Sequence, residues 1–236
     1  MRLDVWLSEN GVKSREEAKR LILAGAVEVK GKKARPSLDV GEEDVVTVLA
    51  RSRYVSRGGC KLEAAVEHFN ISVEGLCCLD IGASTGGFTD CLLQRGAAFV
   101  YALDVGHGQL DESIAKDDRV CSLEGVNIRN VEAGDFERDI DFICCDVSFI
   151  SLKLVLPVIY RVLKGKHAAV LIKPQFECGK SGLGKGGIVK SDKVAERVKE
   201  DIKAFARMTG FDVTGIIPSP IKGGDGNREF LMVVEK

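Results

Sequence analysis

The stretch Leu79-Asp80-Ile81-Gly82-Ala83-Ser84-Thr85-Gly86-Gly87-Phe88-Thr89-Asp90 decides the fold of this chain. It completes an apolar run and passes into small residues, after which Phe88, Leu92 and Leu93 follow at helical spacing. The pattern predicts a strand, a tight glycine turn and a helix. In such a turn the glycines let the backbone approach a ligand closely, and the first N–H groups of the helix face that ligand.

The acidic residue that follows the next apolar run points to a nucleoside-containing cofactor. An acidic side chain about twenty residues after such a turn can accept both hydroxyls of a ribose. Here Asp104 follows the apolar run 99–103. A dinucleotide fingerprint requires G-x-G-x-x-G, whereas this turn reads D-x-G-x-x-x-G-G, with Ser84 where the second glycine would stand. The form D-x-G-A-x-x-G-G-F resembles the loop of S-adenosylmethionine-dependent methyltransferases, in particular the FtsJ-like RNA 2′-O-methyltransferases. By itself the loop also fits an ordinary strand–helix turn of another α/β protein.

Charge is distributed unevenly along the chain. The net charge of −1 over 236 residues gives no global signal for nucleic-acid binding. Residues 1–61, however, hold 13 Lys and Arg against 9 Asp and Glu, a balance of +4. This local excess indicates a polyanion-binding face, and an ordinary solvated surface is the alternative.

The eight cysteines predict core thiols rather than a disulfide frame or a metal site. Cys77-Cys78 and Cys144-Cys145 are adjacent pairs inside apolar runs, and no C-x-x-C spacing occurs. The N-terminus reads as an amphipathic helix rather than a signal peptide, and no apolar run approaches the ~20 residues that span a bilayer. We therefore expect a cytoplasmic protein without membrane or metal partners.

Residues 1–50 predict a small α+β domain. Asn10-Gly11 ends a first helix, Ser14 to Glu17 form a capping box for a second, and the alternation at 27–29 leads into a hairpin. The pattern R-L-D-x-x-L…S-R-x-x-A-x-x-x-I-x-x-G-x-V-x-V-x-G resembles the RNA-binding module named after small-subunit ribosomal protein S-four. A degenerate accessory domain with a solvated helix is the alternative. The resemblance implies that structured RNA docks on the second helix and the loop after it. The candidate RNA-binding residues there and in the basic linker 51–59 are Lys13, Arg15, Lys19, Arg20, Lys32, Lys33 and Arg57.

Residues 60–236 predict an α/β domain with a doubly wound, mostly parallel sheet. Apolar strand candidates at 120–123, 140–145 and 167–172 alternate with helical patterns, which we expect to begin at 106 and 147 among other places. Because ligands gather at the carboxyl ends of such strands, the strand-end residues should converge on one crevice. These residues are Asp80, Asp104, Asp146 and Lys173. The segment 179–187 nearly fits a P-loop, but Gly186 replaces the required Ser or Thr, so we expect a mobile flap that contacts substrate phosphate.

The remaining motifs resemble the TlyA family, whose members were once labelled haemolysins and are now regarded as rRNA 2′-O-methyltransferases. The matching stretches are V-S-R-G-G-x-K-L, L-D-I-G-A-S-T-G-G-F-T, D-V-G-x-G-Q-L, D-V-S-F-I-S-L and K-P-Q-F-E-x-G-K. The resemblance implies a Rossmann-like S-adenosylmethionine methyltransferase fold and 2′-O-methylation of a cytidine in ribosomal RNA, with ribosomal subunits as partners. It does not indicate the oligomeric state. A catalytically inactive ribosome-binding protein is the main alternative, and a membrane-lytic protein is a weaker one.

The resemblance also implies the site residues. The catalytic set carries over as Lys61, Asp146, Lys173 and Glu229, with Lys173 nearest the target hydroxyl. The cofactor contacts carry over as Asp80, Gly82, Ala83, Ser84, Gly86, Gly87, Phe88, Asp104, Leu123 and Glu124. A free lysine titrates near ~10.4, so it serves as a base only where a second cation or desolvation disfavours its protonation, and carboxylates orient both cations. Lys61 by itself also fits an ordinary solvated residue at a helix start.

Overall fold

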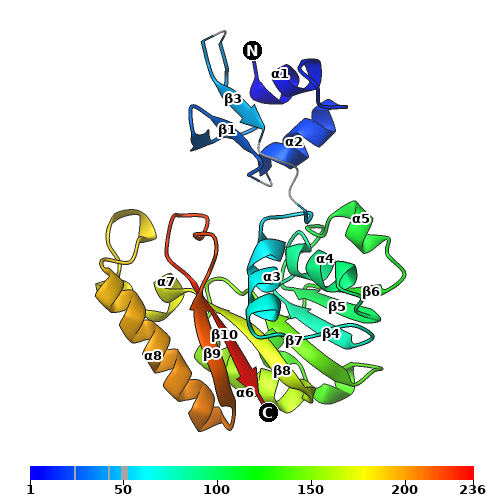
Figure 1. The fold of residues 1–236 in the computed structure, drawn as a ribbon, viewed down its shortest axis with the longest axis vertical. Helices are drawn as coiled ribbons and strands as arrows, with labels where there is room; N and C mark the ends of the chain where they lie inside the picture. The colour runs from blue at the N-terminus through cyan, green and yellow to red at the C-terminus, as the bar shows by residue number, and fades with distance from the viewer. Residues whose placement is uncertain (24, 42, 49–52) are drawn as a thin grey trace. The chain divides into compact units, whose positions relative to one another are not determined.

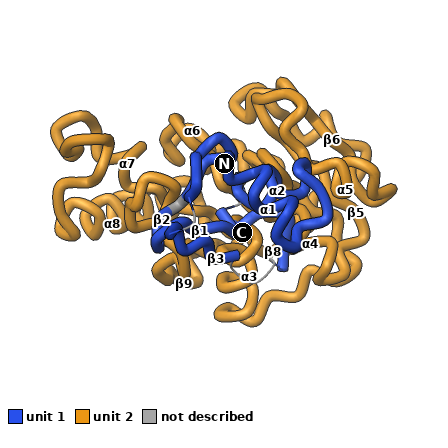
Figure 2. Tube along the Cα trace, turned by 90° about the horizontal axis from the view of Figure 1, so that it is seen from above, with its two compact units in different colours: residues 1–57 blue, residues 58–236 orange. Residues whose placement is uncertain are grey.

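The computed structural model describes residues 1–236 apart from 24, 42 and 49–52. The chain forms two compact units, residues 1–57 and 58–236 (Figure 2). The first part of the expected linker, 51–52, lies outside the described residues, whereas Gly58 and Gly59 already belong to helix α3 (Gly58–His68). Each unit has its own core.

The first unit packs two helices against a small antiparallel sheet. Helices α1 (Leu3–Glu9) and α2 (Arg15–Leu23) accompany strands β1 (Val27–Val29), β2 (Lys32–Lys33) and β3 (Val46–Val48), in the order β2-β1-β3. The predicted cap is present, because the Glu17 N–H donates to Ser14 Oγ at 3.1 Å. The apolar faces of both helices meet β1 in a core that contains Leu3, Leu7, Ala18, Ile22 and Val27.

The second unit is built on a seven-stranded sheet with the order β6-β5-β4-β7-β8-β10-β9 (Figure 1). The first five strands of that order run parallel, and β10 is antiparallel to both of its neighbours. The predicted doubly wound, mostly parallel sheet is therefore confirmed. The strands are β4 (Cys77–Ile81), β5 (Phe99–Asp104), β6 (Val120–Glu124), β7 (Ile140–Cys145), β8 (Leu163–Ile172), β9 (Asp212–Pro218) and β10 (Phe230–Glu235).

Helices cover both faces of this sheet. Helices α3 and α4 pack together on one face, and α6 and α8 pack together on the other (Figure 1). Helices α5 and α7 are single short turns. The remaining helices of this unit are α4 (Gly87–Gln94), α5 (Glu112–Ala115), α6 (Leu152–Val162), α7 (Pro174–Glu177) and α8 (Asp192–Thr209), with 3₁₀ turns at Ile128–Asn130, Ala133–Asp135, Lys180–Gly182 and Lys185–Gly187.

Two of the expected helix starts are wrong. The segment 106–110 is not helical, because Asp104 and Glu124 accept the N–H groups of Gly106 and Gly108, and α5 begins only after its cap Asp111. Helix α6 begins at Leu152 rather than near 147, because Phe149 adopts a left-handed conformation with φ 63°. Both segments directly follow strands, β5 and β7, and so lie at the carboxyl edge of the sheet.

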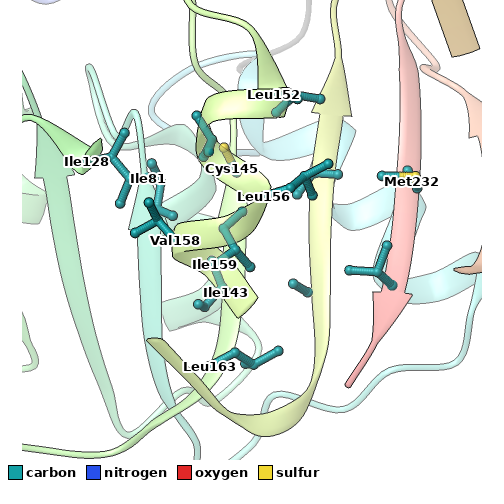
Figure 3. Packing of buried hydrophobic residues seen from close by; sticks show 14 of the residues in the cluster. Ile81, Ile128, Ile143, Cys145, Leu152, Leu156, Val158, Ile159, Leu163 and Met232 are labelled. Carbon is teal, nitrogen blue, oxygen red and sulfur yellow. The ribbon is translucent and has the colours of Figure 1, made fainter. Parts of the chain in front are cut away.

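The main core lies between the sheet and α6. Figure 3 shows Leu152, Leu156 and Ile159 of the helix directed at Ile143 and Cys145 of β7. Alternation along each strand sends the two members of each cysteine pair to opposite faces, and the eight cysteines are all free. Burial raises the pKa of the Cys77 thiol to about 11, which keeps this thiol protonated at neutral pH. The prediction of core thiols at the two pairs is confirmed.

Candidate active site

The carboxyl ends of the central strands meet at one edge of the sheet. In the strand register, Asp104 lies beside Glu124, and Phe230 lies opposite Ile172. The Asp146 N–H donates to the carbonyl of Ile81 at 2.9 Å, which brings the residue after β7 against the end of β4. The predicted convergence of strand-end polar residues is present in the structure.

The glycine turn after β4 lies close against β7. Gly82 has φ 85°, and a Cβ there would lie 2.5 Å from the carbonyl oxygen of Asp146. Gly86 caps helix α4 with φ 89°, and its Cβ would lie 2.8 Å from Leu110. Only glycine fits both the left-handed backbone and the close neighbour at these two positions. The turn is therefore a close-fitting cradle, in which Ala83, Gly87 and Phe88 are buried.

Asp80 is a fully buried carboxylate directly before this turn. Its Oδ2 accepts a hydrogen bond from Thr89 Oγ1 at 2.7 Å, which connects the end of β4 to the first turn of α4. Burial raises the pKa of Asp80 to about 7, the Thr89 hydrogen bond opposes the increase, and the nearby Asp146 charge adds to it. A buried acid of this kind is well suited to a cationic ligand, because a positive charge would stabilise its ionised form.

The two acidic residues on β5 and β6 both hold loop backbone. Asp104 accepts the N–H groups of Ser84 at 2.9 Å and of Gly106 at 2.7 Å, whereas Glu124 accepts that of Gly108 at 2.9 Å. Leu123 beside them is half-buried and Glu124 is exposed. Because each carboxylate oxygen has two lone pairs, both side chains keep acceptor capacity for ligand hydroxyl or amino groups. The donor and acceptor set thus fits a nucleoside with an attached cation.

Four charged side chains form a continuous chain beside the cradle. Glu229 Oε2 lies 2.7 Å from Lys61 Nζ, which lies 3.6 Å from Asp146 Oδ2, and Asp146 Oδ1 lies 2.5 Å from Lys173 Nζ. The side chains come from α3, from the residues that follow β7 and β8, and from the residue before β10. All four predicted catalytic residues are therefore neighbours in the structure.

The two lysines of this chain of charges are almost equally buried and differ in their partners. The Lys61 side chain is 10% exposed and lies between two carboxylates, so the solvated helix-start interpretation is wrong. Lys173 contacts only one carboxylate of the set, and its Nζ also donates to Ser148 Oγ at 2.9 Å. An ammonium has three donors. Lys173 is thus the lysine that already binds a hydroxyl and can bind another.

Sequence reasoning missed four contacts that join the residues after β7 to the residues after β8. Besides the bond from Lys173 to Ser148, the rings of Phe149 and Phe176 lie 4.9 Å apart. Glu177 accepts from the Ser151 hydroxyl at 2.6 Å and from the Leu152 N–H at 2.7 Å. The motifs D-V-S-F-I-S-L and K-P-Q-F-E contain all of these residues, but only the tertiary structure pairs them.

Phe149 is the unusual member of this group. Phe149 is 90% exposed. Its φ of 63° places the backbone in the left-handed region, which is strained for an aromatic residue. An exposed aromatic ring close to Lys173 offers a surface on which a nucleobase can stack.

Comparison with known proteins agrees with this geometry. The family model for FtsJ-like methyltransferases matches residues 54–236, and the model for the S4 domain matches residues 1–46. The chain is 41% identical to the 16S/23S rRNA (cytidine-2′-O)-methyltransferase TlyA of Mycobacterium tuberculosis, over 98% of this chain and 88% of that protein. This chain belongs to the TlyA family of FtsJ-like methyltransferases. The resemblances stated from the sequence are confirmed.

Two further relatives of this TlyA-family chain carry hemolysin names. Hemolysin A of Brachyspira hyodysenteriae is 44% identical, over 98% of each chain. A solved structure described as a hemolysin from Streptococcus thermophilus is 45% identical and has a TM-score of 0.80, covering all of this chain and 88% of that one. Among the described residues, no helix is long and apolar enough to cross a bilayer.

The S4 domain places most of the predicted RNA-binding residues at its surface. Lys13, Arg15, Arg20 and Lys32 are exposed, whereas Lys19 and Arg57 are half-buried. The Lys33 side chain lies outside the described part of the chain. A Cβ on Gly25 would lie 2.9 Å from Arg57 Nε, so the Arg57 side chain rests on the turn after α2.

Arg15 differs from the other predicted RNA contacts because it is also part of the S4 domain's structure. Its Nε donates to Asp4 Oδ2 at 2.9 Å, and Arg2 pairs with the same carboxylate at 3.0 Å. Asp4 is fully buried, and these guanidinium groups hold its pKa well below the usual range. A loss of RNA binding in an Arg15 variant would therefore mix a lost phosphate contact with a damaged domain.

No cluster of three or more metal-ligating side chains occurs among the residues that the structure describes.

Proposed function

We propose that this chain methylates the 2′-hydroxyl of a cytidine ribose in ribosomal RNA, with S-adenosylmethionine as methyl donor. The observation that carries the proposal is the chain of charges from Glu229 through Lys61 and Asp146 to Lys173, beside a glycine cradle of methyltransferase type. TlyA of Mycobacterium tuberculosis, a 41% identical relative, is named as an enzyme of this activity. Ribosomal subunits would be the partners, and the cytoplasm the place of action.

The residues of the cradle would hold the cofactor. Asp104 and Glu124 offer acceptors to ribose hydroxyls and the adenine amino group, and Asp80 supplies a buried negative charge. When bound, S-adenosylmethionine supplies a methyl group on a sulfonium centre that leaves as a neutral thioether. The backbone of the turn, including Gly82, Ser84 and Gly86, would pack against it because the glycines leave room for close approach.

Lys173 would act on the target hydroxyl. Its bond to Ser148 Oγ shows that the ammonium can reach a hydroxyl while Asp146 holds it. Orientation of the ribose oxygen contributes a large part of the rate in a displacement of this kind. The proton of the hydroxyl would leave through the Lys173–Asp146 pair, and Lys61 would keep Asp146 in place between the two cations.

The S4 domain would hold the RNA. RNA helices are recognised mainly through their shape and phosphates, for which the exposed basic residues of α2 and β2 are suited. Phe149 would stack on a base near the target nucleotide, since it is exposed and lies two contacts from Lys173.

Tritium transfer from labelled S-adenosylmethionine to purified small subunits, large subunits and naked rRNA tests the proposal. Lys173→Ala should abolish incorporation while cofactor affinity stays within about threefold, because Lys173 lies on the hydroxyl side of the centre. Lys166→Ala is the matched control, because Lys166 lies in the same strand β8 that precedes Lys173 and makes only a surface ion pair with Glu235.

The outcomes separate the alternatives. Ribose label in one substrate, lost in Lys173→Ala and kept in Lys166→Ala, supports the enzyme. Cofactor binding without label on any substrate, or no cofactor binding at all, contradicts it and favours an inactive RNA-binding protein. Lysis of red cells by detergent-free protein would instead favour the activity that the hemolysin names suggest.

A further inference from the structure

The glycine- and lysine-rich segment 179–190 is a closed loop with its own hydrogen bonds. The Gly184 N–H donates to the carbonyl of Ile188 at 2.7 Å, and the Lys190 N–H donates to that of Gly182 at 3.0 Å. Leu183 and Val189 form an isolated antiparallel β-bridge. Lys190 Nζ also donates to the carbonyl of Ser181 at 2.9 Å. The expected mobility of the segment stays a prediction, but its backbone is folded.

All the charged side chains of this loop are positive. Its twelve residues contain three lysines and no acidic residue. Lys190 is used in closing the loop, whereas Lys180 and Lys185 are exposed and form no ion pair within the described residues. Two free ammonium groups on a glycine backbone are suited to phosphate, which needs positive charge and close approach of the chain.

The buried side-chain amide of Asn227 attaches the loop to the segment that carries Glu229 and leads into β10. Asn227 is 2% exposed, its Oδ1 accepts the Val189 N–H at 2.9 Å, and its Nδ2 donates to the Gly187 carbonyl at 3.1 Å. An amide is the side chain that can satisfy one donor and one acceptor of the same loop. The Asn227 side chain therefore fixes the loop through hydrogen bonds to the backbone of the loop.

The two residues after Asn227 connect this attachment to the reaction centre. Arg228 lies 3.4 Å from Glu196 of α8, which follows the loop, and Glu229 binds Lys61. A Cβ on Gly223 would lie 2.5 Å from Glu229 Oε1, and the Gly223 N–H donates to the Asn227 carbonyl. Two residues span at most about 7 Å of extended chain, so the loop is held at a fixed short distance from Glu229.

We propose that loop 179–190 binds the RNA backbone next to the target nucleotide through Lys180 and Lys185, and that Asn227 is the positioning residue that fixes this contact relative to Glu229. The proposal rests on the proposed RNA methylation. An RNA strand whose ribose reaches Lys173 would pass this loop, where two phosphates would pair with the two ammonium groups. The loop would set the register of the strand and leave the chemistry to the four charged residues.

The test combines a charge variant, an attachment variant and a matched control. Lys180→Gln with Lys185→Gln removes the two free charges, and Asn227→Ala removes both hydrogen bonds to the loop. Lys166→Gln with Lys203→Gln removes the same charge from β8 and α8, away from the loop. Initial rates with ribosomal subunits at saturating S-adenosylmethionine give kcat and KM, and filter binding of total rRNA over a salt series gives the slope. Thermal unfolding and cofactor Kd show whether each variant is folded.

We expect the Lys180/Lys185 variant to raise the KM for subunits about tenfold with kcat within about twofold, because phosphate contacts bind without reacting. Its salt slope should fall by about 1.4, at about 0.7 for each phosphate on a single strand. Asn227→Ala should raise KM similarly with unchanged cofactor Kd. Adding the two lysine changes to Asn227→Ala should then raise KM by a smaller factor than adding them to the parent protein, because the misplaced lysines no longer reach phosphate.

Other results would overturn the inference. A Lys180/Lys185 variant that matches the Lys166/Lys203 control excludes the phosphate contact. A loss of kcat alone in Asn227→Ala, or full additivity of the changes, shows that Asn227 acts through Glu229 and not through the loop. If the parent protein transfers no methyl group, the proposed function fails, but the salt slopes of RNA binding still decide the role of the loop.

Discussion

Asp80→Asn should change the stability of the methyltransferase unit in a way that depends on pH. Asp80 is fully buried at the end of β4 and accepts a hydrogen bond from Thr89. Burial, the largest cause, raises its pKa from 3.8 to about 7. Asparagine keeps the size of the side chain and an oxygen that accepts from Thr89, but it has no charge to bury.

The sign of the effect follows from proton binding. Between pH 4 and 7 the folded chain holds a proton on Asp80 that the unfolded chain has lost, so the stability of the native protein falls as pH rises through this window. A difference of about three pKa units, at about 1.36 kcal/mol each, corresponds to about 4 kcal/mol at most. Asp80→Asn should therefore be up to about 4 kcal/mol more stable than the parent at pH 8, and close to it at pH 4.

Denaturant unfolding at pH 5, 6, 7 and 8 measures this difference. The chain offers an internal control, because Trp6, its single tryptophan, lies in the S4 domain, far along the sequence from Asp80. Far-UV circular dichroism follows the larger methyltransferase unit, while tryptophan fluorescence follows the S4 domain, whose midpoint should not respond to Asp80→Asn. Subtracting the parent curve removes the groups that titrate equally in both proteins.

A stability difference that stays constant from pH 5 to pH 8 would refute the reasoning, because it would show that Asp80 does not gain a proton in the native state. A parent protein more stable than Asp80→Asn at pH 8 would show that the ionised carboxylate is favourably solvated. In the supported case, S-adenosylmethionine should bind the parent more tightly at pH 8 than at pH 6, because a cation stabilises the ionised acid.

Four further substitutions test the site and the S4 domain. Lys61→Met should lower the free energy of unfolding by about 3–5 kcal/mol and abolish methyl transfer, because it leaves two carboxylates without their shared cation; denaturant unfolding and tritium transfer measure both. Phe149→Ala should raise the KM for RNA by about five- to 150-fold through lost stacking of about 1–3 kcal/mol, with an unchanged melting temperature because the ring is exposed; an unchanged KM would exclude stacking. Arg15→Gln should lower both RNA affinity and the unfolding midpoint reported by Trp6, whereas Lys13→Gln should lower RNA affinity alone; equal midpoints in the two variants would show that the ion pair of Arg15 does not stabilise the domain.

The sequence predicted the sheet and the cradle well because both depend on short-range patterns. The run from Leu79 to Asp90 contains its own strand, turn and helix start, and the small residues announce the close approach that Gly82 makes to β7. Strand-end acids such as Asp104 and Asp146 follow from topology alone, since parallel strands end at one edge. These features need no knowledge of distant neighbours.

The failures have the opposite cause. The helix expected from residue 106 does not form, because Asp104 and Glu124 accept N–H groups of Gly106 and Gly108, a use of side chains that apolar spacing does not reveal. The RNA contact of Arg15 stays a prediction, but the sequence did not reveal its pairing with the buried Asp4, which depends on how α2 packs on α1. In each case a polar contact between segments decided the outcome.

The catalytic set combines residues that strand topology predicted with a residue that it did not predict. Asp146 and Lys173 were placed at the sheet edge by strand topology, but Glu229 lies 168 residues from Lys61 and was assigned only from resemblance. The structure supplies the physical reason for the pair: the Lys61 side chain is buried, so its charge needs carboxylates on both sides. The four charges alternate and sum to zero, and each inner member contacts two partners. Removing an inner member takes a partner from two neighbours, whereas removing an end member leaves its neighbour with one partner. The geometry of the set depends on α3, β7, β8 and β10 being held together by the sheet.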